Sequence, residues 1–238
     1  MNFDFSRVFE QLTPLLWQGL WVTVWISVVS IVLGMIVGLI SCFMVISQPR
    51  RARGPLRWLL YAFKGIAGAY VWIIRGTPMI VQAMFFFFGV NQVLRNISPD
   101  LLLSPVAAGI ITVTLNAGAY FTEIFRAGID AVDKGQSEAA RSLGLSQAKT
   151  MRKVILPQAL RMSLPPTVNQ WIISVKDTSL LSVIGVAELM QQTRIYAMGV
   201  FVFFESFIYV ALWYLAILSV LMILSKRLEA RISYDKKS

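Results

Sequence analysis

No histidine occurs among the 238 residues, and Cys42 is the only cysteine. An internal disulfide is therefore impossible, and the common zinc and haem sites, which need histidine or clustered cysteine, are excluded. The phosphate-binding motif G-x-x-x-x-G-K-[ST] is also absent from the sequence. We expect no metal, no cofactor and no catalytic residue in this chain, and if ATP drives it, another polypeptide must bind the ATP.

Charge is scarce as well. Asp, Glu, Lys and Arg make up 14% of the chain and apolar residues 57%, a balance outside that of ordinary soluble domains. From Gln11 to Pro49 no residue is charged, and as a helix this stretch would extend roughly 58 Å, well beyond the ~30 Å hydrocarbon core of a bilayer. One crossing with an interfacial lead-in near Pro14 fits best. The length of the stretch, and Asp4 and Glu10 before it, argue against a cleaved signal peptide.

The apolar blocks predict an all-α membrane protein with about five transmembrane helices. The candidate crossings are residues 20–45, 58–94, 105–125, 165–187 and 205–225. Within the second block, Arg75-Gly76-Thr77-Pro78 should interrupt the helix, because glycine and proline weaken or kink helices. We expect one net crossing broken at this point. No internal repeat or soluble domain is visible, so a single transmembrane domain accounts for residues 1–238.

The cations predict how the chain is oriented. The net charge is +10, but Lys and Arg lie in short segments beside the apolar blocks, which favours lipid headgroups over nucleic acid as their partners. The putative outer segments hold only Arg7, Arg95 and Arg194. Because cytoplasmic loops carry an excess of Lys and Arg, the N-terminus should lie outside and the C-terminus in the cytoplasm. The inner segments hold 16 of the 22 cations: Arg50, Arg51, Arg53, Arg57, Arg126, Lys134, Arg141, Lys149, Arg152, Lys153, Arg161, Lys226, Arg227, Arg231, Lys236 and Lys237.

A polar, basic insert, EAARSLGLSQAKTMRKVILP, occupies residues 138–157 between apolar blocks. Ser137 can cap a short helix whose Ala139 and Ala140 are small enough for close contact, and Gly144 can end it in a left-handed conformation. A helix this short is marginal alone in water. The segment is therefore expected to gain order by docking against something else.

Two opposite charges lie in the fourth candidate crossing. Lys176 and Asp177 are about eleven residues from either end, where a charge requires a partner or water. One interpretation is that they line a translocation path and bind the carboxylate and amine of an amino acid. The other is a structural ion pair that fixes helix packing or a helix break.

Other polar residues in or near the crossings have two interpretations as well. Glu123 has Arg126 three residues later, so a local surface pair explains it about as well as a functional role. Asn116 and Asn169 could form hydrogen bonds between helices. Arg75 could anchor the predicted break by binding a backbone carbonyl there.

Several motifs in one order resemble the permeases of ABC importers for polar amino acids, of the histidine, glutamine and arginine type. The resemblance covers about residues 17–228. The motifs are Arg75-Gly76-Thr77-Pro78 with Gln82; Ala119-Tyr120 with Glu123, Arg126 and Gly128; Glu138-Ala139-Ala140 with Gly144; Ile155-Leu156-Pro157-Gln158-Ala159; and Lys176-Asp177-Thr178-Ser179-Leu180.

This resemblance implies a type I importer permease in the bacterial inner membrane. Its expected partners are an identical or homologous permease subunit, an ABC ATPase dimer that binds ATP and Mg²⁺, and an extracytoplasmic amino-acid-binding protein. The cytoplasmic loop 128–161 would couple to the ATPase and drive alternating access. The coupling residues would be Glu138, Ala139, Ala140, Gly144, Ile155, Leu156 and Pro157, and the candidate substrate-binding residues are Lys176, Asp177, Glu123, Asn116 and Asn169.

Two other functions are considered beside this one. An ion- or proton-coupled secondary carrier or channel could use Lys176 and Asp177 without ATP, although the sequence has no internal inverted repeat. A membrane scaffold that only recruits an ATPase would have no use for opposite charges at that depth.

The orientation can be tested with fused reporters. A reporter that is active only outside the cytoplasm should work when it is fused near residue 98 and fail near residue 145, because cations gather in the segments assigned to the cytoplasm. Activity near residue 145 would contradict the five-crossing arrangement.

Overall fold

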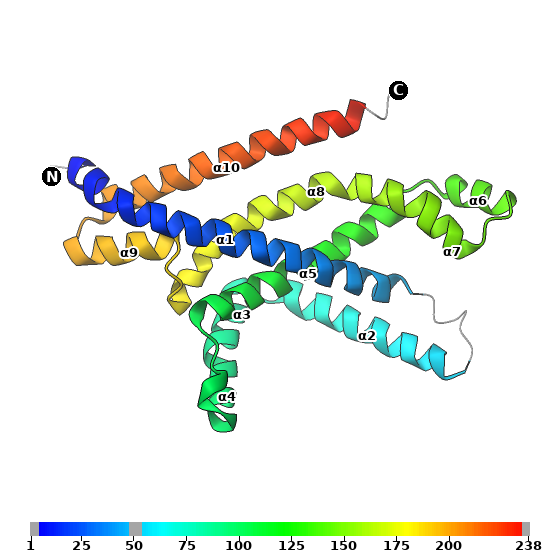
Figure 1. The fold of residues 1–238 in the computed structure, drawn as a ribbon, viewed down its shortest axis with the longest axis horizontal. Coiled ribbons are helices and arrows are strands. Elements are labelled where there is room, and N and C mark those ends of the chain that lie inside the picture. Colours follow the sequence, from blue (N-terminus) through cyan, green and yellow to red (C-terminus); the bar gives the residue numbers. More distant parts are fainter. Residues whose placement is uncertain (1–4, 48–53, 235–238) are drawn as a thin grey trace.

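The computed structural model describes residues 5–47 and 54–234, and helices dominate them. The long helices run roughly along one axis (Figure 1). α9 (Leu189–Val200) and the start of α1 lie at one end, and α6 (Lys134–Ser142) and α7 (Gln147–Thr150) lie at the other. The long helices are α1 (Phe5–Ile46), α2 (Pro55–Gly76), α5 (Pro105–Asp130), α8 (Leu156–Asp177) and α10 (Phe203–Tyr234).

Small residues bring α1 and α5 into close contact at the centre of the molecule. A Cβ added at Gly38 would lie 2.4 Å from the Cβ of Phe121 and 3.0 Å from the carbonyl oxygen of Gly118. Phe121 itself is completely buried. Because lipid supplies no hydrophobic drive between helices, such close van der Waals packing holds membrane helices together.

The second block is broken where the sequence predicts. α2 ends at Gly76, and the next helices, α3 (Met79–Met84) and α4 (Asn91–Ile97), turn 109° away from its axis (Figure 1). Between them the run of phenylalanines forms the π-helical segment Phe85–Val90.

The side chain of Gln82 stabilises this break. Its amide nitrogen lies 2.8 Å from the carbonyl oxygen of Ile74 and 3.0 Å from that of Thr77, and its amide oxygen accepts a hydrogen bond from Asn116 of α5 at 3.2 Å. The last carbonyls of a helix have no partner within the helix. Because an unpaired carbonyl is costly away from water, the buried Gln82 replaces the missing backbone donors.

The predicted ends of the fourth crossing were wrong. The helix α8 already begins at Leu156, runs through Pro165 and Pro166, and ends at Asp177, where the 3₁₀ segment Thr178–Ile184 takes over. The two prolines were expected to mark the start of the helix, but they lie inside it. A proline within a helix removes one backbone hydrogen-bond donor and bends the helix, and the helix continues when the surrounding structure stabilises the bend. Lys176 and Asp177 therefore lie at the end of a helix and not in its middle.

The other crossings keep their places with longer helices. α1 continues through Pro14, so the proposed lead-in is part of the same helix, and α5 extends to Asp130. In the described part of the chain, α1, α5 and α10 are long and apolar enough to cross a membrane, and the bent pair α2 with Met79–Ile97 makes a fourth span if counted as one. α8, the fifth long helix, is not among the helices that are both long enough and apolar enough to cross a membrane.

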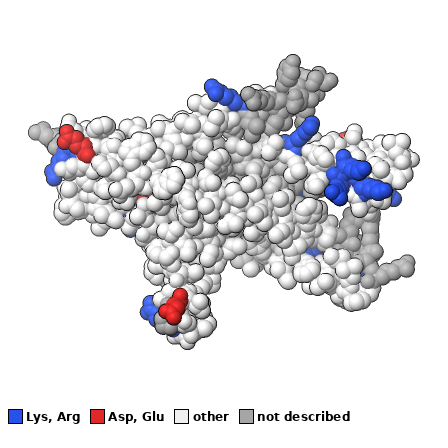
Figure 2. All heavy atoms as spheres, in the orientation of Figure 1, with Lys and Arg blue, Asp and Glu red and all other residues white. Residues whose placement is uncertain are grey.

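Charges lie mainly away from the middle of the molecule. In Figure 2 the visible Lys and Arg gather toward the end that carries α6 and α7, whereas the middle of this face is largely uncharged. Arg50, Arg51, Arg53, Lys236 and Lys237, which contributed to the predicted orientation, lie outside the described residues.

The α1–α5 contact predicts a large effect for one methyl group. Gly38→Ala should destabilise the protein by about 1–3 kcal/mol, because the new Cβ would meet a Cβ and backbone atoms that cannot rotate away. Gly65→Ala on α2 is the control, since nothing lies within 4 Å of a Cβ there. Thermal unfolding of the purified protein in detergent measures the difference, and equal melting temperatures would contradict the packing.

Candidate functional site

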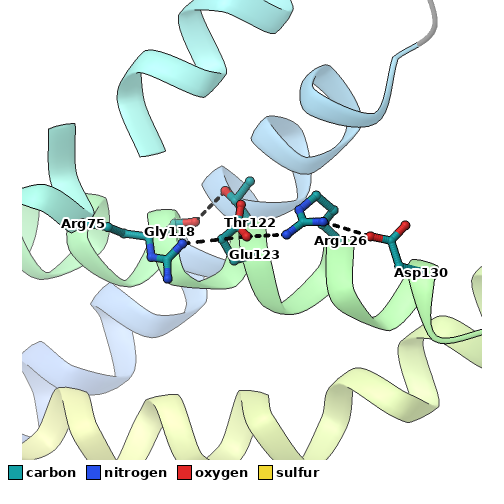
Figure 3. A network of polar contacts seen from close by, with 6 residues as sticks. All are labelled: Arg75, Gly118, Thr122, Glu123, Arg126 and Asp130. Carbon is teal, nitrogen blue, oxygen red and sulfur yellow. Dashed lines mark hydrogen bonds and ion pairs between the residues drawn. The ribbon is translucent and has the colours of Figure 1, made fainter. Parts of the chain in front are cut away.

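A row of alternating charges runs along one face of α5 (Figure 3). Arg126 contacts two carboxylates, with its Nη2 2.7 Å from Oε2 of Glu123 and its Nη1 2.9 Å from Oδ2 of Asp130. The hydroxyl of Thr122 donates to the carbonyl oxygen of Gly118 beside them. The local pair of Glu123 and Arg126 is therefore formed, as one interpretation of the sequence predicts.

Arg75, from the last turn of α2, meets this row from the side (Figure 3). Its guanidinium lies 5.3 Å from the ring centre of Tyr120, within the range of a cation–π contact. Its Nη1 is 3.7 Å from the same Oε2 of Glu123 that Arg126 binds. Two arginines from different helices thus face one carboxylate.

Arg75, Tyr120 and Glu123 line a cavity of about 510 Å³ between α1, α2 and α5. Its size is within the range of small-molecule sites in proteins. Its lining includes both charged and apolar side chains, so the cavity can hold a charged group and a hydrocarbon stem at the same time. The lining residues are Val45, Gly68, Val71, Trp72, Arg75, Gly76, Tyr120 and Glu123.

The ion pair between Lys176 and Asp177, which was the structural alternative for these residues, is not formed within the described part of the chain. Lys176 is exposed and Asp177 is partly buried, and the three ion pairs found among the described residues all involve Glu123 or Arg126. The charges are consequently available to a ligand or to another subunit. Their role in binding substrate stays a prediction.

The structure gives the two candidate asparagines different surroundings. Asn116 is buried and donates to Gln82, so it supports the break after α2. Asn169 is exposed on α8, seven positions before Lys176 and hence on the same side of the helix. No contact among the described residues brings the five predicted substrate residues together.

The helix at the start of the polar, basic insert begins earlier than predicted. α6 starts at Lys134 and its cap is Asp133, whose carboxylate accepts a hydrogen bond from the amide of Gly135 at 2.8 Å. The expected cap Ser137 lies inside the helix, because a carboxylate four residues earlier already satisfies a free amide. Gly144 follows the helix with φ of +81°, which confirms the predicted left-handed turn.

Most of this insert faces outward. Glu138 and Ala139 are exposed, whereas Ala140 is buried against the protein. Leu143, at the turn, is 84% exposed. Among the three later coupling candidates, Ile155 is buried, Leu156 is partly buried and Pro157 is exposed.

Sequence reasoning missed Glu188 entirely. This carboxylate is fully buried and caps α9, accepting hydrogen bonds from the amides of Met190 at 2.9 Å and Gln191 at 2.7 Å. The hydroxyl of Tyr214 on α10 donates to it at 2.9 Å. An isolated acidic residue directly after an apolar run could have indicated a helix cap. The predicted fourth crossing ended at Ala187, and because no helix was expected after it, Glu188 was not considered as a cap.

Comparison with known proteins identifies relatives over most of the chain. Residues 30–234 match the family described as "Binding-protein-dependent transport system inner membrane component". The chain is 46% identical over 166 residues to the glutamine transport system permease protein GlnP of Escherichia coli, which covers 70% of this chain and 74% of the relative. It is 34% identical over 232 residues to the arginine transport system permease protein ArtQ of Bacillus subtilis, which covers 98% of each.

Solved structures agree with these relatives. A chain of an amino acid ABC transporter, whose crystal structure was determined with histidines, superposes with a TM-score of 0.86 at 34% identity and covers 97% of this chain and 100% of that one. An inward-facing MetNI methionine ABC transporter superposes with a TM-score of 0.75 at 19% identity, covering 94% and 98% of the two chains, which shows a shared fold.

Proposed function

Because the chain belongs to the family of inner membrane components of binding-protein-dependent transport systems, we propose that it carries polar amino acids into the cytoplasm by alternating access. It is a multi-pass inner membrane permease and not an enzyme, and a separate ATPase subunit hydrolyses ATP. Relatives named for glutamine and arginine transport support a polar amino acid as the substrate. A secondary carrier or a mere scaffold finds no support in this family.

The observation that carries the proposal is a cavity that offers both signs of charge. Between α2 and α5, Arg75 and Glu123 present a guanidinium and a carboxylate to the same space, a pairing suited to a zwitterion. Lys176 and Asp177 offer a second pair of charges at the end of α8, with Asn169 on the same helix. Asn116 contributes through Gln82, by holding the break that positions Arg75.

The insert 138–157 is proposed as the surface that the ATPase binds. Glu138, Ala139 and the exposed Leu143 would contact the ATPase directly. Gly144 shapes the turn that presents them. Ile155, Leu156 and Pro157 join the insert to α8, so displacement of the insert would move the helix that carries Lys176.

We place the whole chain, residues 1–238, in one transmembrane permease domain with a core of about 17–228 and a coupling loop of 128–161. The proposed assembly adds an identical or homologous permease subunit, an ABC ATPase dimer with ATP and Mg²⁺, and an extracytoplasmic amino-acid-binding protein. Vesicles that contain this assembly should take up labelled glutamine or arginine only when ATP is inside. Uptake of neither amino acid, or uptake without ATP, would contradict the proposal.

A prediction for coupling concerns the left-handed turn. Gly144→Val should detach the ATPase or uncouple it from uptake while membrane insertion stays normal, because a β-branched residue resists positive φ. Gly54→Val is the matched control, since Gly54 has φ of +63° in a different loop and equally open space around it. Co-purification of the ATPase and ATP-dependent uptake are measured for both. Loss of the ATPase or of uptake in both variants, or normal ATPase retention together with normal uptake in both, would count against the docking surface.

A further prediction concerns Lys176. Lys176→Ala should abolish uptake while the subunit still inserts and retains its ATPase, because a substrate carboxylate would lose its counter-charge. Since no ion pair joins Lys176 to Asp177, the double variant Lys176→Ala with Asp177→Ala should also stay inactive. Uptake is normalised to the amount of assembled complex. Substantial transport by the double variant would instead indicate that the two charges only balance each other, because the partly buried Asp177 would no longer remain without its neighbouring opposite charge.

A further inference from the structure

Arg75 has more hydrogen-bonding capacity than its neighbours use. A guanidinium carries five N–H donors, yet the contacts of Arg75 among the described residues are the ring of Tyr120 and Oε2 of Glu123. The distance to Glu123 is 3.7 Å, too long for a hydrogen bond. The side chain is 42% exposed and lines the cavity between α2 and α5.

Glu123 does not depend on Arg75 for its counter-charge. Its Oε2 is 2.7 Å from Arg126, and Arg126 also holds Asp130 at 2.9 Å. Both arginines approach the same oxygen of Glu123, so Oε1 takes part in neither ion pair. Arg75 can therefore turn to another anion without leaving Glu123 unpaired.

We propose that Arg75 binds the α-carboxylate of the transported amino acid inside this cavity, with Oε1 of Glu123 facing the α-ammonium group. A guanidinium binds a carboxylate through two parallel hydrogen bonds, a geometry that a lysine cannot offer. The ring of Tyr120 lies against the guanidinium and limits its rotation. Val71 and Trp72 supply an apolar wall for the side-chain stem of the ligand.

This site is additional to Lys176 and Asp177, and it rests on the proposed function. A zwitterion adds no net charge to a cavity whose lining charges, Arg75 and Glu123, are of opposite sign. Amino acids whose α-carboxylate is blocked should be rejected, because the charge of Arg75 would then be desolvated without a partner.

The test uses the permease with its ATPase in nanodiscs, without the binding protein, so that selection by that protein is avoided. Binding of radiolabelled glutamine and arginine is measured, with the unlabelled amino acid or its α-carboxamide as competitor. The wild-type complex should prefer the free amino acid to the amide. Arg75→Gln should weaken binding of the amino acid by about tenfold to a hundredfold, the usual range for a hydrogen bond to a charged group, and remove that preference.

Arg57→Gln is the matched control for charge and stacking. Arg57 begins the same helix and lies over Tyr61 at 5.8 Å, but it does not line the cavity. Its substitution should change neither the affinity nor the preference. If Arg75 served only to pair with Glu123, the double variant Arg75→Gln with Glu123→Gln would restore binding; the proposed site requires binding to stay weak.

A second pair of variants tests the cavity without changing charge. Gly68 lines the cavity and Gly65 on the same helix does not, and a Cβ at either position meets nothing within 4 Å. Gly68→Leu should weaken binding by filling the space, whereas Gly65→Leu should not.

The outcomes separate this inference from the proposed function. Absence of ATP-dependent uptake by the wild-type assembly would overturn the proposed function and this site with it. If wild-type uptake is normal, three results would overturn the site while leaving the proposed function intact. Arg75→Gln could keep the preference for the free amino acid, or Gly68→Leu and Gly65→Leu could bind alike. The third result is that the wild-type nanodisc complex binds neither amino acid.

Discussion

The carbonyl groups at the end of α2 need hydrogen-bond donors, and the candidate site around Arg75 depends on how this need is met. In a bilayer, a helix can end inside the protein only if its last carbonyls find donors there. Gln82 provides those donors and is itself held by Asn116 of α5. The end of α2 is thereby fixed against α5, and Arg75 is placed beside Tyr120 and Glu123. The position of the cavity that we propose for the substrate is a consequence of how these carbonyl groups are satisfied.

The charged residues of the membrane domain include some that pair closely with one another and some that do not. On α5 the sequence spacing puts Glu123, Arg126 and Asp130 on one face, where they neutralise one another at hydrogen-bonding distance. Arg75 and Lys176 differ from them, because both are exposed and neither has a carboxylate at hydrogen-bonding distance among the described residues. Cations that a fold leaves available in this way are suited to an anionic group of a ligand, and they lie on two different helices of the bundle.

The sequence predicts the helical membrane fold, the break after Arg75 and the left-handed turn at Gly144, since each follows from apolar length or from the backbone preferences of glycine and proline. It does not predict where α8 begins and ends, because Pro165 and Pro166 are accommodated by the surrounding structure. Asn116 and Glu188 also show the limit. Whether a buried polar group holds a helix or binds a ligand depends on partners far away in sequence, here Gln82 and Tyr214.

Glu188 has a consequence for how the permease can move. One of its oxygens accepts from the backbone of α9, and the other is shared between that backbone and Tyr214 of α10. Separating these helices would remove the hydrogen bond from Tyr214 and leave the fully buried carboxylate with one donor fewer, which is costly. α9 and α10 should therefore travel as one rigid unit during transport. The displacement that exposes the cavity to either side must then be absorbed elsewhere, at the 3₁₀ segment after Asp177 and at the bend between α2 and α3.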